Sequence, residues 1–441
     1  MRLYNSDCYT RTDNVVRFFA GLGVGVISVL VPLYQSEMAP KWIRGTLVCA
    51  YQLAITTGLL LAAIVNIITE SRDDTNAFRI PLAMQFVWAG ILLLGLILLP
   101  ETPRYLIKRN RHTAAALSLS RLRRLDITHP ALIEELAEIE ANHEYELSLG
   151  PSTYSDVFLG SPHLGRRILT GCGLQMLQQL SGCNFIFYYG TTFFERINIR
   201  NPFVIQLITN IVNVVSTLPG MVLVESLGRR RLLMIGASGM AVCQLIVACV
   251  GTALPDSYVA NVVLIAFVCF YLFFFAASWG PVVWVVTSEI YPLKVRAKSM
   301  SISTASNWLL NFAIAYGTPY LVGDSPGLNL QAKVFFVWGA FCVISLAFVW
   351  CMVYETSKIS LEQIDEMYER VDHAWNSKSF QPSWSFQEMR DEGASASGIQ
   401  LTEHEDARRR TGTSASAAES GTTMTEEDKI IAQLGDVDMS Y

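Results

Sequence analysis

Apolar residues are gathered into nine long blocks along the chain. Each block runs for about 18 residues or more with few charges, which is long enough for a helix to cross the hydrocarbon core of a bilayer. Because lipid cannot hydrogen-bond an open backbone, segments of this length are predicted to be helices. The predicted spans are 17–36, 47–68, 80–99, 168–190, 203–224, 232–252, 261–287, 299–323 and 332–354.

The connections between these spans alternate in charge. One set is basic and comprises Lys41 with Arg44, 104–124, 229–231 and 294–298. The other set holds acidic residues such as Asp73 and Asp256. The positive-inside rule places the basic set in the cytoplasm, together with the C-terminal tail. It also leaves the N-terminus outside, with no secretory signal to carry it there.

Two regions outside the spans differ in character. Residues 101–167 are predicted to be a cytoplasmic helical linker, in which Pro130 opens an amphipathic helix and Thr128 is a candidate cap. Ser, Thr, Gly, Ala and acidic residues dominate the C-terminus, which is typical of a disordered tail. The predicted layout is a short segment 1–16, three helices in 17–100, the linker 101–167, a six-helix bundle 168–355, an amphipathic segment 356–371 and a disordered cytoplasmic tail 372–441.

The chain repeats itself. PLYQSEMAPKWIRG (32–45) and WVVTSEIYPLKVRAK (284–298) both follow a long span, and their Glu, Pro and Arg residues share one offset of 252 positions. Spans 1–3 and 7–9 are therefore predicted to be copies of one three-helix unit, while spans 4–6 form a second unit. A transporter built from two parallel six-helix halves would need a further copy of that second unit. We expect an all-α membrane protein of the major facilitator fold, with about nine transmembrane helices of an expected twelve. By itself such a chain is expected to transport little or nothing.

Composition excludes several classes of protein. Charged residues make up 16% of the 441 residues and the mean hydropathy is +0.34, which is typical of an integral membrane protein. Nucleic-acid binding has no support in the charge pattern. The nine cysteines form no CxxC pair and the histidines lie outside the spans, so no metal site is predicted. The chain has no P-loop and no nucleophile elbow, so neither an enzyme, nor a cofactor, nor an ATP-driven pump is expected.

Charged residues recur where spans are expected to enter the cytoplasm. A Glu and an Arg lie seven positions apart across a proline turn in both repeats, and ESLGRRR ends the fifth span with a similar cluster. Such charges can join two halves when the cytoplasmic side is closed and separate when it opens. Ordinary interfacial anchoring is the alternative, but the repetition favours a gate. The residues are Glu37, Arg44, Glu225, Arg229, Arg230, Glu289 and Arg296.

Neutral polar residues lie inside several spans. Polar groups are costly in a membrane, so they usually face a partner or a water-filled cavity. Amides suit the hydroxyls of a neutral polyol and aromatic rings suit its C–H surface, whereas an amino acid or organic ion would need a buried countercharge. Helix–helix packing is the alternative for each residue. The set is Gln52, Gln175, Gln178, Gln179, Asn184, Tyr188, Tyr189, Asn210, Asn213, Trp284, Asn307 and Asn311.

Four motifs together resemble the sugar porter family of the major facilitator superfamily, and fungal hexose transporters in particular. They are QQLSGCNFIFYYG (178–190), PETPRYL, GPVVWVVTSEIYPLKVRAK and ESLGRRR, and the resemblance covers roughly residues 15–370. It implies a two-bundle fold, a central sugar site and alternating access. By this resemblance the sugar contacts are Gln52, Gln178, Gln179, Asn184, Tyr188, Tyr189, Asn213, Trp284, Asn307 and Asn311, and the charge network gains Glu101 and Arg104.

The chain departs from the family pattern at its start. The family's first three helices, with the aspartate of proton-coupled members, have no counterpart here. Arg17 matches the arginine that partners this aspartate, and Gln85 occupies a position that is acidic in some proton-coupled members. These two residues are therefore the candidates for proton coupling. YETSK replaces the usual PETKG but keeps its glutamate, Glu355.

Three functional hypotheses follow. The leading one is a multi-pass plasma-membrane protein that moves a hexose by alternating access, with protons as a candidate second substrate and the lipid bilayer as its surroundings. The second is a sugar sensor on the same scaffold, whose tail binds regulatory proteins. The third is an inactive truncated product, which the order of the repeats supports.

Overall fold

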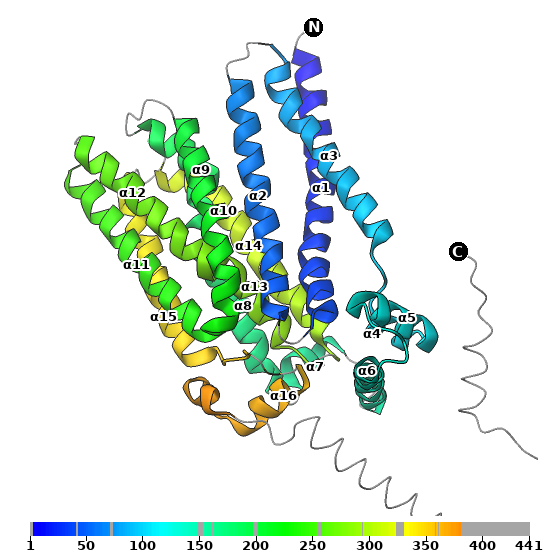
Figure 1. Cartoon of the computed structure of the whole chain (residues 1–441). Coiled ribbons are helices and arrows are strands. Elements are labelled where there is room, and N and C mark those ends of the chain that lie inside the picture. The colour runs from blue at the N-terminus through cyan, green and yellow to red at the C-terminus, as the bar shows by residue number, and fades with distance from the viewer. Residues whose placement is uncertain are drawn as a thin grey trace, which may run out of the picture. The chain divides into compact units, whose positions relative to one another are not determined.

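The computed structural model describes residues 3–40, 43–70, 74–148, 153–160, 163–196, 202–254, 258–292, 294–322, 330–357, 359 and 361–380. The chain divides into two compact units, Met1–Phe380 and Gln381–Tyr441. All described residues belong to the first unit, so most of the predicted disordered tail lies outside them. Within the described residues all regular secondary structure is helical (Figure 1), as the sequence predicts.

The first three predicted spans are three long helices, drawn in blue to cyan in Figure 1. They are α1 (Leu3–Met38), α2 (Arg44–Glu70) and α3 (Asn76–Leu98). Residues 3–16, which the sequence set apart as a separate segment, continue the helix of α1. The side chains of α3 are largely exposed in the bundle, including Leu93, Leu96 and Leu98. Exposed leucines in such number are expected of a helix that faces lipid.

The remaining predicted spans form a second group of helices, two of which are interrupted. The span 168–190 breaks at Ser181–Gly182, and the span 261–287 contains a π-helix, Phe275–Trp279. The helices are α8 (Leu164–Leu180), α9 (Cys183–Arg196), α10 (Pro202–Ser226), α11 (Arg229–Ala253), α12 (Tyr258–Phe274), α13 (Gly280–Glu289), α14 (Arg296–Val322) and α15 (Val334–Met352), the last preceded by a 3₁₀ turn, Gln331–Lys333.

Seven helical segments within the described residues are long and apolar enough to cross a membrane. The predicted span 168–190 is not among them because its break divides it into two shorter helices. Nor is α14, since Ser, Thr and Asn residues such as Asn307 and Asn311 lower its hydropathy. Both elements nevertheless lie within the bundle, where α14 packs against α8. The chain is therefore a multi-pass membrane protein.

Helix packing concentrates the core in the second group. There α11 packs along α15, and α12 and the π-helix pack on α10 and α11. Fully buried residues such as Leu233 and Ala237 of α11, Val285 of α13 and Val349 of α15 form this core. Among the first three helices, α2 makes the closest approach to this group because it packs along α10 and α13.

The linker between the two groups is helical, as expected. It holds α4 (Pro103–Lys108), α5 (His112–Arg123), α6 (Pro130–Ser148) and α7 (Tyr154–Leu159). The predicted cap of α6, Thr128, is wrong: its hydroxyl donates to Asp126 Oδ1 at 2.8 Å. His129 takes the capping position, and its Nδ1 accepts from the Ala131 N–H at 3.2 Å. A tight Asx turn therefore holds Thr128 away from the helix terminus.

The chain after α15 stays ordered beyond the predicted start of the tail. Helix α16 (Leu361–Arg370) is followed by a 3₁₀ helix, Ala374–Ser379, so the prediction of disorder from residue 372 is wrong for 372–380. Tyr354, Ile364, Met367 and Tyr368 form a small buried cluster with Ala374. The amphipathic face of α16 supplies this cluster, and its burial orders the residues that follow.

Candidate substrate-binding site

The break between α8 and α9 is the centre of a buried amide cluster. Asn307, on α14, donates from Nδ2 to Gln175 Oε1 at 2.7 Å and to Gln178 Oε1 at 2.9 Å. Gln179 Nε2 in turn donates to Asn307 Oδ1 at 2.9 Å. Asn184, just after the break, donates to Gln179 Oε1. These amides hold α8, α9 and α14 together in the interior of the bundle.

The cluster extends toward more exposed residues of α9 and α14. Asn311 Nδ2 lies 3.4 Å from Gln179 Oε1 and 3.2 Å from the hydroxyl of Tyr188. Tyr188 is 49% exposed, so the cluster reaches an exposed side chain at this edge. Because the amides already bond one another, a ligand that binds here must exchange hydrogen bonds with them.

The π-helix between α12 and α13 is attached directly to this cluster. Gln178 Nε2 donates to the carbonyls of Trp279 at 2.9 Å and Gly280 at 3.0 Å. Pro281 follows these carbonyls and has no N–H, so the backbone here is already irregular. A π-helix often marks a functional site, and here one glutamine joins it to α8.

Two predicted contacts border the cluster at the same bend. A side chain at Gly280 would meet Gln52 Nε2 at 3.1 Å, so Gln52 of α2 packs directly against this glycine. Trp284 stands edge-on to the ring of Tyr51, with 5.4 Å between ring centroids. The site thus has walls from α2 and α13 as well as α8, α9 and α14.

Four predicted residues lie apart from the amide cluster. Tyr189 turns to α14 and donates to the Ala315 carbonyl at 2.7 Å. Asn213 is buried in α10, and its amide has no hydrogen-bond partner among the described residues. Arg17 lines a groove along α1, and Gln85 is exposed on α3. Gln175 is a member that sequence reasoning noted as polar but did not select.

A second cluster, of charged residues, lies at one end of the bundle, which we call the charged end. Arg229 is 1% exposed, and its guanidinium donates to Glu289 Oε1 at 3.0 Å and to Glu225 Oε2 at 2.9 Å. The hydroxyl of Thr356 donates to Glu289 Oε2 at 2.7 Å. Paired charges of this kind need such partners, because one left alone would be costly to bury.

Glu355 completes the charged end, although it was outside the predicted network. Its carboxylate accepts from the backbone N–H groups of Arg229 at 2.9 Å and Arg230 at 3.1 Å, where α11 begins. Anions are favoured at a helix N-terminus. Burial nevertheless raises the pKa of the Glu355 carboxyl above its ordinary value, although these backbone donors oppose the shift. The sequence signal that pointed to it was the glutamate that YETSK shares with the family motif PETKG.

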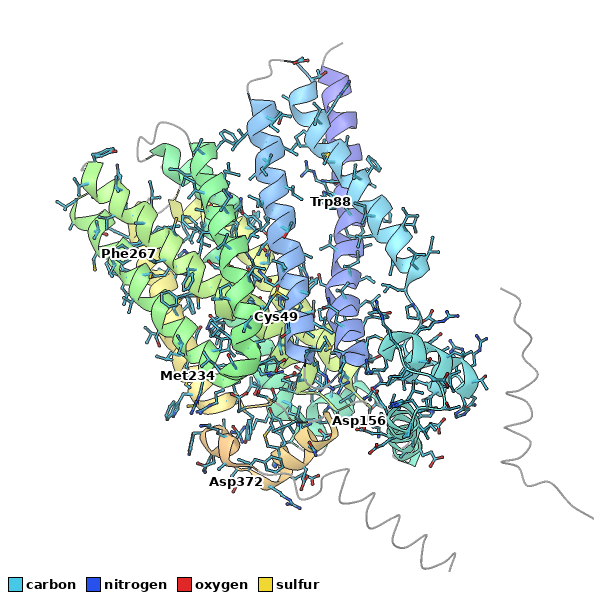
Figure 2. The ribbon with its side chains drawn as sticks, in the orientation of Figure 1. Cys49, Trp88, Asp156, Met234, Phe267 and Asp372 are labelled. Carbon is cyan, nitrogen blue, oxygen red and sulfur yellow. The ribbon has the colours of Figure 1, made fainter. Side chains whose placement is uncertain are left out.

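Helix α2 closes onto the charged end from the other three-helix unit. The hydroxyl of Thr46 donates to the Met221 carbonyl of α10 at 3.0 Å. A side chain at Gly45 would meet Glu225 Oε1 at 2.5 Å and Arg229 Nη2 at 2.7 Å, so any larger residue here would have to displace this ion pair. Cys49, one turn further along α2, is completely buried (Figure 2). Gly45 was not singled out by sequence reasoning.

The other predicted charges lie around this end and bond backbone carbonyls or line a cavity. Arg230 Nη2 donates to the Trp350 carbonyl at 2.9 Å, and Arg296 Nε donates to the Tyr291 carbonyl at 3.1 Å. The Glu101 carbonyl accepts a hydrogen bond from Ser118 at 2.6 Å. Three more line a small cavity between α1 and the linker helices, namely Glu37, Arg44 and Arg104.

The linker is held to α1 by a residue that the sequence did not single out. Arg123 of α5 donates to the Met38 carbonyl at 3.0 Å and pairs with Glu135 of α6 at 2.5 Å. Among the residues described here, no group of three or more His, Cys, Asp or Glu side chains is arranged to hold a metal.

Interrupted helices around buried neutral amides, with a charged cluster at one end of the bundle, are typical of a membrane transporter of the major facilitator type. Residues 14–368 match the family model described as "Sugar (and other) transporter", and the chain belongs to that family. The family is one of transporters, so the chain is not assigned to the enzymes.

Individual relatives agree with this assignment. The chain is 68% identical over 394 residues to a "Probable glucose transporter rco-3" of Neurospora crassa, covering 88% of this chain and 66% of that protein. It is 44% identical over 373 residues to a "High glucose sensor RGT2" of Saccharomyces cerevisiae, covering 82% of this chain and 49% of that protein. The chain therefore spans from about half to about two thirds of the length of these relatives.

A solved structure confirms the fold. The proton:xylose symporter XylE bound to 6-bromo-6-deoxy-D-glucose is similar with a TM-score of 0.70 and 27% sequence identity. The match covers 80% of this chain and 73% of that chain. The major facilitator fold predicted from the internal repeat and the motifs is therefore correct.

Proposed function

We propose that the protein moves a hexose across the membrane by alternating access. The observation that carries this proposal is the buried cluster of neutral amides at the break between α8 and α9. Each amide offers both donors and an acceptor, which matches a sugar hydroxyl that donates and accepts at once. The relative named as a probable glucose transporter supports the same class of substrate.

The absence of charge from the amide cluster argues for a neutral substrate. Its members are Gln175, Gln178, Gln179, Asn184, Asn307 and Asn311, together with Tyr188. A carboxylate or ammonium held among these groups would lack a countercharge, and burying an unpaired charge is costly. The rings of Tyr188 and Trp284 offer apolar faces for the C–H surface of a sugar.

The charged end supplies the gate of this proposal. We place it, and the C-terminal tail, on the cytoplasmic side of the plasma membrane, in keeping with the positive-inside rule. In the arrangement seen here α2 is closed against Glu225 and Arg229. Opening toward the cytoplasm would separate α2 from this cluster. Arg17 and Gln85 remain the positions at which to test proton coupling.

A sugar sensor is the second candidate, and one contact favours it. Glu355, which bonds the start of α11, also donates its backbone N–H to the Ser377 hydroxyl at 2.9 Å. The charged end is thus joined to the last segment that the structure describes, which ends at residue 380. A relative at 44% identity carries the name of a glucose sensor. If the protein is a sensor, opening of the charged end would be transmitted through this contact to the C-terminal tail.

The substrate class is tested by equilibrium binding of labelled glucose to the purified chain in lipid nanodiscs, beside a labelled amino acid and a labelled dicarboxylate. We expect glucose to bind and the two charged ligands not to bind. Binding of either charged ligand, with none of any monosaccharide, would contradict the proposal. Counterflow of labelled glucose in proteoliposomes then separates a transporter from a sensor, because only a transporter exchanges sugar across the bilayer.

A further inference from the structure

The break between α8 and α9 is held by residues outside the amide cluster. The Ser181 carbonyl, at the end of α8, accepts a hydrogen bond from the Tyr271 hydroxyl of α12 at 3.0 Å. It accepts a second from Gln244 Nε2 of α11 at 3.1 Å. The thiol of Cys342, on α15, lies 3.9 Å away as a third donor. Three other helices, α11, α12 and α15, thus converge on one carbonyl.

These hydrogen bonds satisfy a backbone carbonyl that the break leaves without a helical partner. A carbonyl that has lost its helical partner in a membrane interior is costly if it stays unsatisfied, because lipid offers no hydrogen-bond donor. Ser181 is completely buried, and its own hydroxyl is used on the Gln178 carbonyl at 2.7 Å. Tyr271 and Gln244 are 1% exposed each, so no solvent competes for their donors. The break is therefore fixed in place by its neighbours.

The position of this break decides the geometry of the amide cluster. Gln178 and Gln179 precede it, whereas Asn184 and Tyr188 follow it. The hydrogen bond from Asn184 to Gln179 spans it directly. A change in the angle between α8 and α9 would therefore move one part of the cluster relative to the other.

We propose that Tyr271 and Gln244 are positioning residues for the hexose site. By holding the Ser181 carbonyl they set the angle between α8 and α9, and with it the spacing of the amides that select sugar stereochemistry. The inference rests on the proposed function, because it assumes that the amides bind a hexose. Neither residue belongs to the amide cluster, since both donate to the break itself.

The test is the double variant Tyr271→Phe with Gln244→Leu, measured by glucose binding in nanodiscs. The phenylalanine keeps the ring that stacks on Phe275, with 6.3 Å between centroids. We expect the dissociation constant for glucose to rise about tenfold, the size typical of a lost hydrogen-bonded geometry. We also expect discrimination between glucose and its C4 epimer galactose to fall. Loss of a structural contact alone would not change that ratio.

Tyr354→Phe is the matched control. Tyr354 is equally buried and its hydroxyl also donates to backbone carbonyls, of Val371 at 2.9 Å and Asp372 at 3.1 Å, but these lie in the segment after α15. Its glucose affinity and its glucose-to-galactose ratio should stay those of the unchanged protein. An equal change in the control, or an unchanged ratio in a folded double variant, overturns the inference.

A second readout does not depend on sugar. Cys183 is the first residue of α9 and is 3% exposed, so alkylation of its thiol reports whether the break has loosened. In the double variant we expect faster alkylation of Cys183 by peptide mass spectrometry, with no change at Cys243, which is buried within α11. If the unchanged protein binds no hexose, the proposed function fails, whereas unchanged alkylation of Cys183 would show that the two residues do not hold the break.

Discussion

Asn307 links α14 to α8 in the candidate site through several hydrogen bonds. One of its amide atoms donates to Gln175 and Gln178, and the other accepts from Gln179. The side chain is 3% exposed, so its bonding capacity is used within the protein. Sugar recognition at this point would be an exchange of one set of hydrogen bonds for another. Such exchange permits release as well as binding, which a transporter requires.

At this residue scale we predict that Gln179→Ala and Asn184→Ala each weaken glucose binding by about tenfold or more, because each removes a hydrogen-bonding amide from the site. Equilibrium binding to purified, folded protein is the measurement. Asn210→Ala is the control, since Asn210 is a buried amide of α10 whose Nδ2 donates to the Gln206 carbonyl of its own helix. Unchanged affinity in both site variants would assign these residues to helix packing.

Two helices of the bundle are interrupted, and the interruptions lie against each other. Gln178, at the end of α8, bonds the carbonyls of the π-helix that precedes Pro281. At the other interruption Gly182 has φ +86° and packs on Trp338. Only glycine adopts that backbone conformation without strain. Each interruption thus coincides with a glycine or proline in the sequence, Gly182 or Pro281, and each packs against or bonds a residue of another helix.

At the scale of the element, Gly182→Ala should destabilise the protein. The left-handed backbone costs a residue with a Cβ about 1–2 kcal/mol, and the Cβ would meet Trp338 Cγ at 2.7 Å. The midpoint of thermal unfolding in detergent should therefore fall. Gly317→Ala is the matched control in α14, where nothing lies within 4 Å, and it should hold or raise the midpoint because alanine favours a helix. A fall of equal size in both variants would contradict this account.

The two groups of spans meet at the charged end through α2. Gly45 touches the Glu225–Arg229 pair, and Thr46 bonds the backbone of α10. The same cluster continues through Glu355 to Ser377. Arg167 donates to the carbonyl of Ile290, the residue after Glu289, and pairs with Asp365 of α16. In Figure 2 Asp372 marks this segment, on the side of the bundle where the charged end lies. Closure of the bundle and order in the segment after α15 therefore share contacts.

For the whole molecule we predict that Gly45→Val opens the charged end. Its side chain would displace Glu225 and Arg229 from α2, and Cys49, now completely buried, would become reactive. The rate of maleimide labelling at Cys49 measures this opening. Gly58→Val on the same helix, where nothing lies within 4 Å, should leave the rate unchanged. Equal labelling of Cys49 in both variants would show that this contact does not close the bundle.

The order and number of the helical spans, the internal repeat and the family membership follow from the sequence itself. They depend on the length of apolar runs and on short motifs, and both are local properties of the chain. Most of the polar residues predicted from the spans lie in or beside one cluster, because buried polar groups must find partners. Asn213 and Tyr189 lie apart from it. A helix presents its residues in several directions, and composition alone does not say which neighbour each one faces.

Only the tertiary structure decided which distant residues meet. The hydrogen bonds of Tyr271 and Gln244 to Ser181, the approach of Gly45 to Arg229, and the contact of Glu355 with Ser377 join elements far apart along the chain. Hydropathy determines that a segment is buried in the bilayer, but packing between helices determines its rotation and depth against each neighbour. The sequence therefore determined which residues enter the membrane, and the packing of the bundle determined which of them form a site.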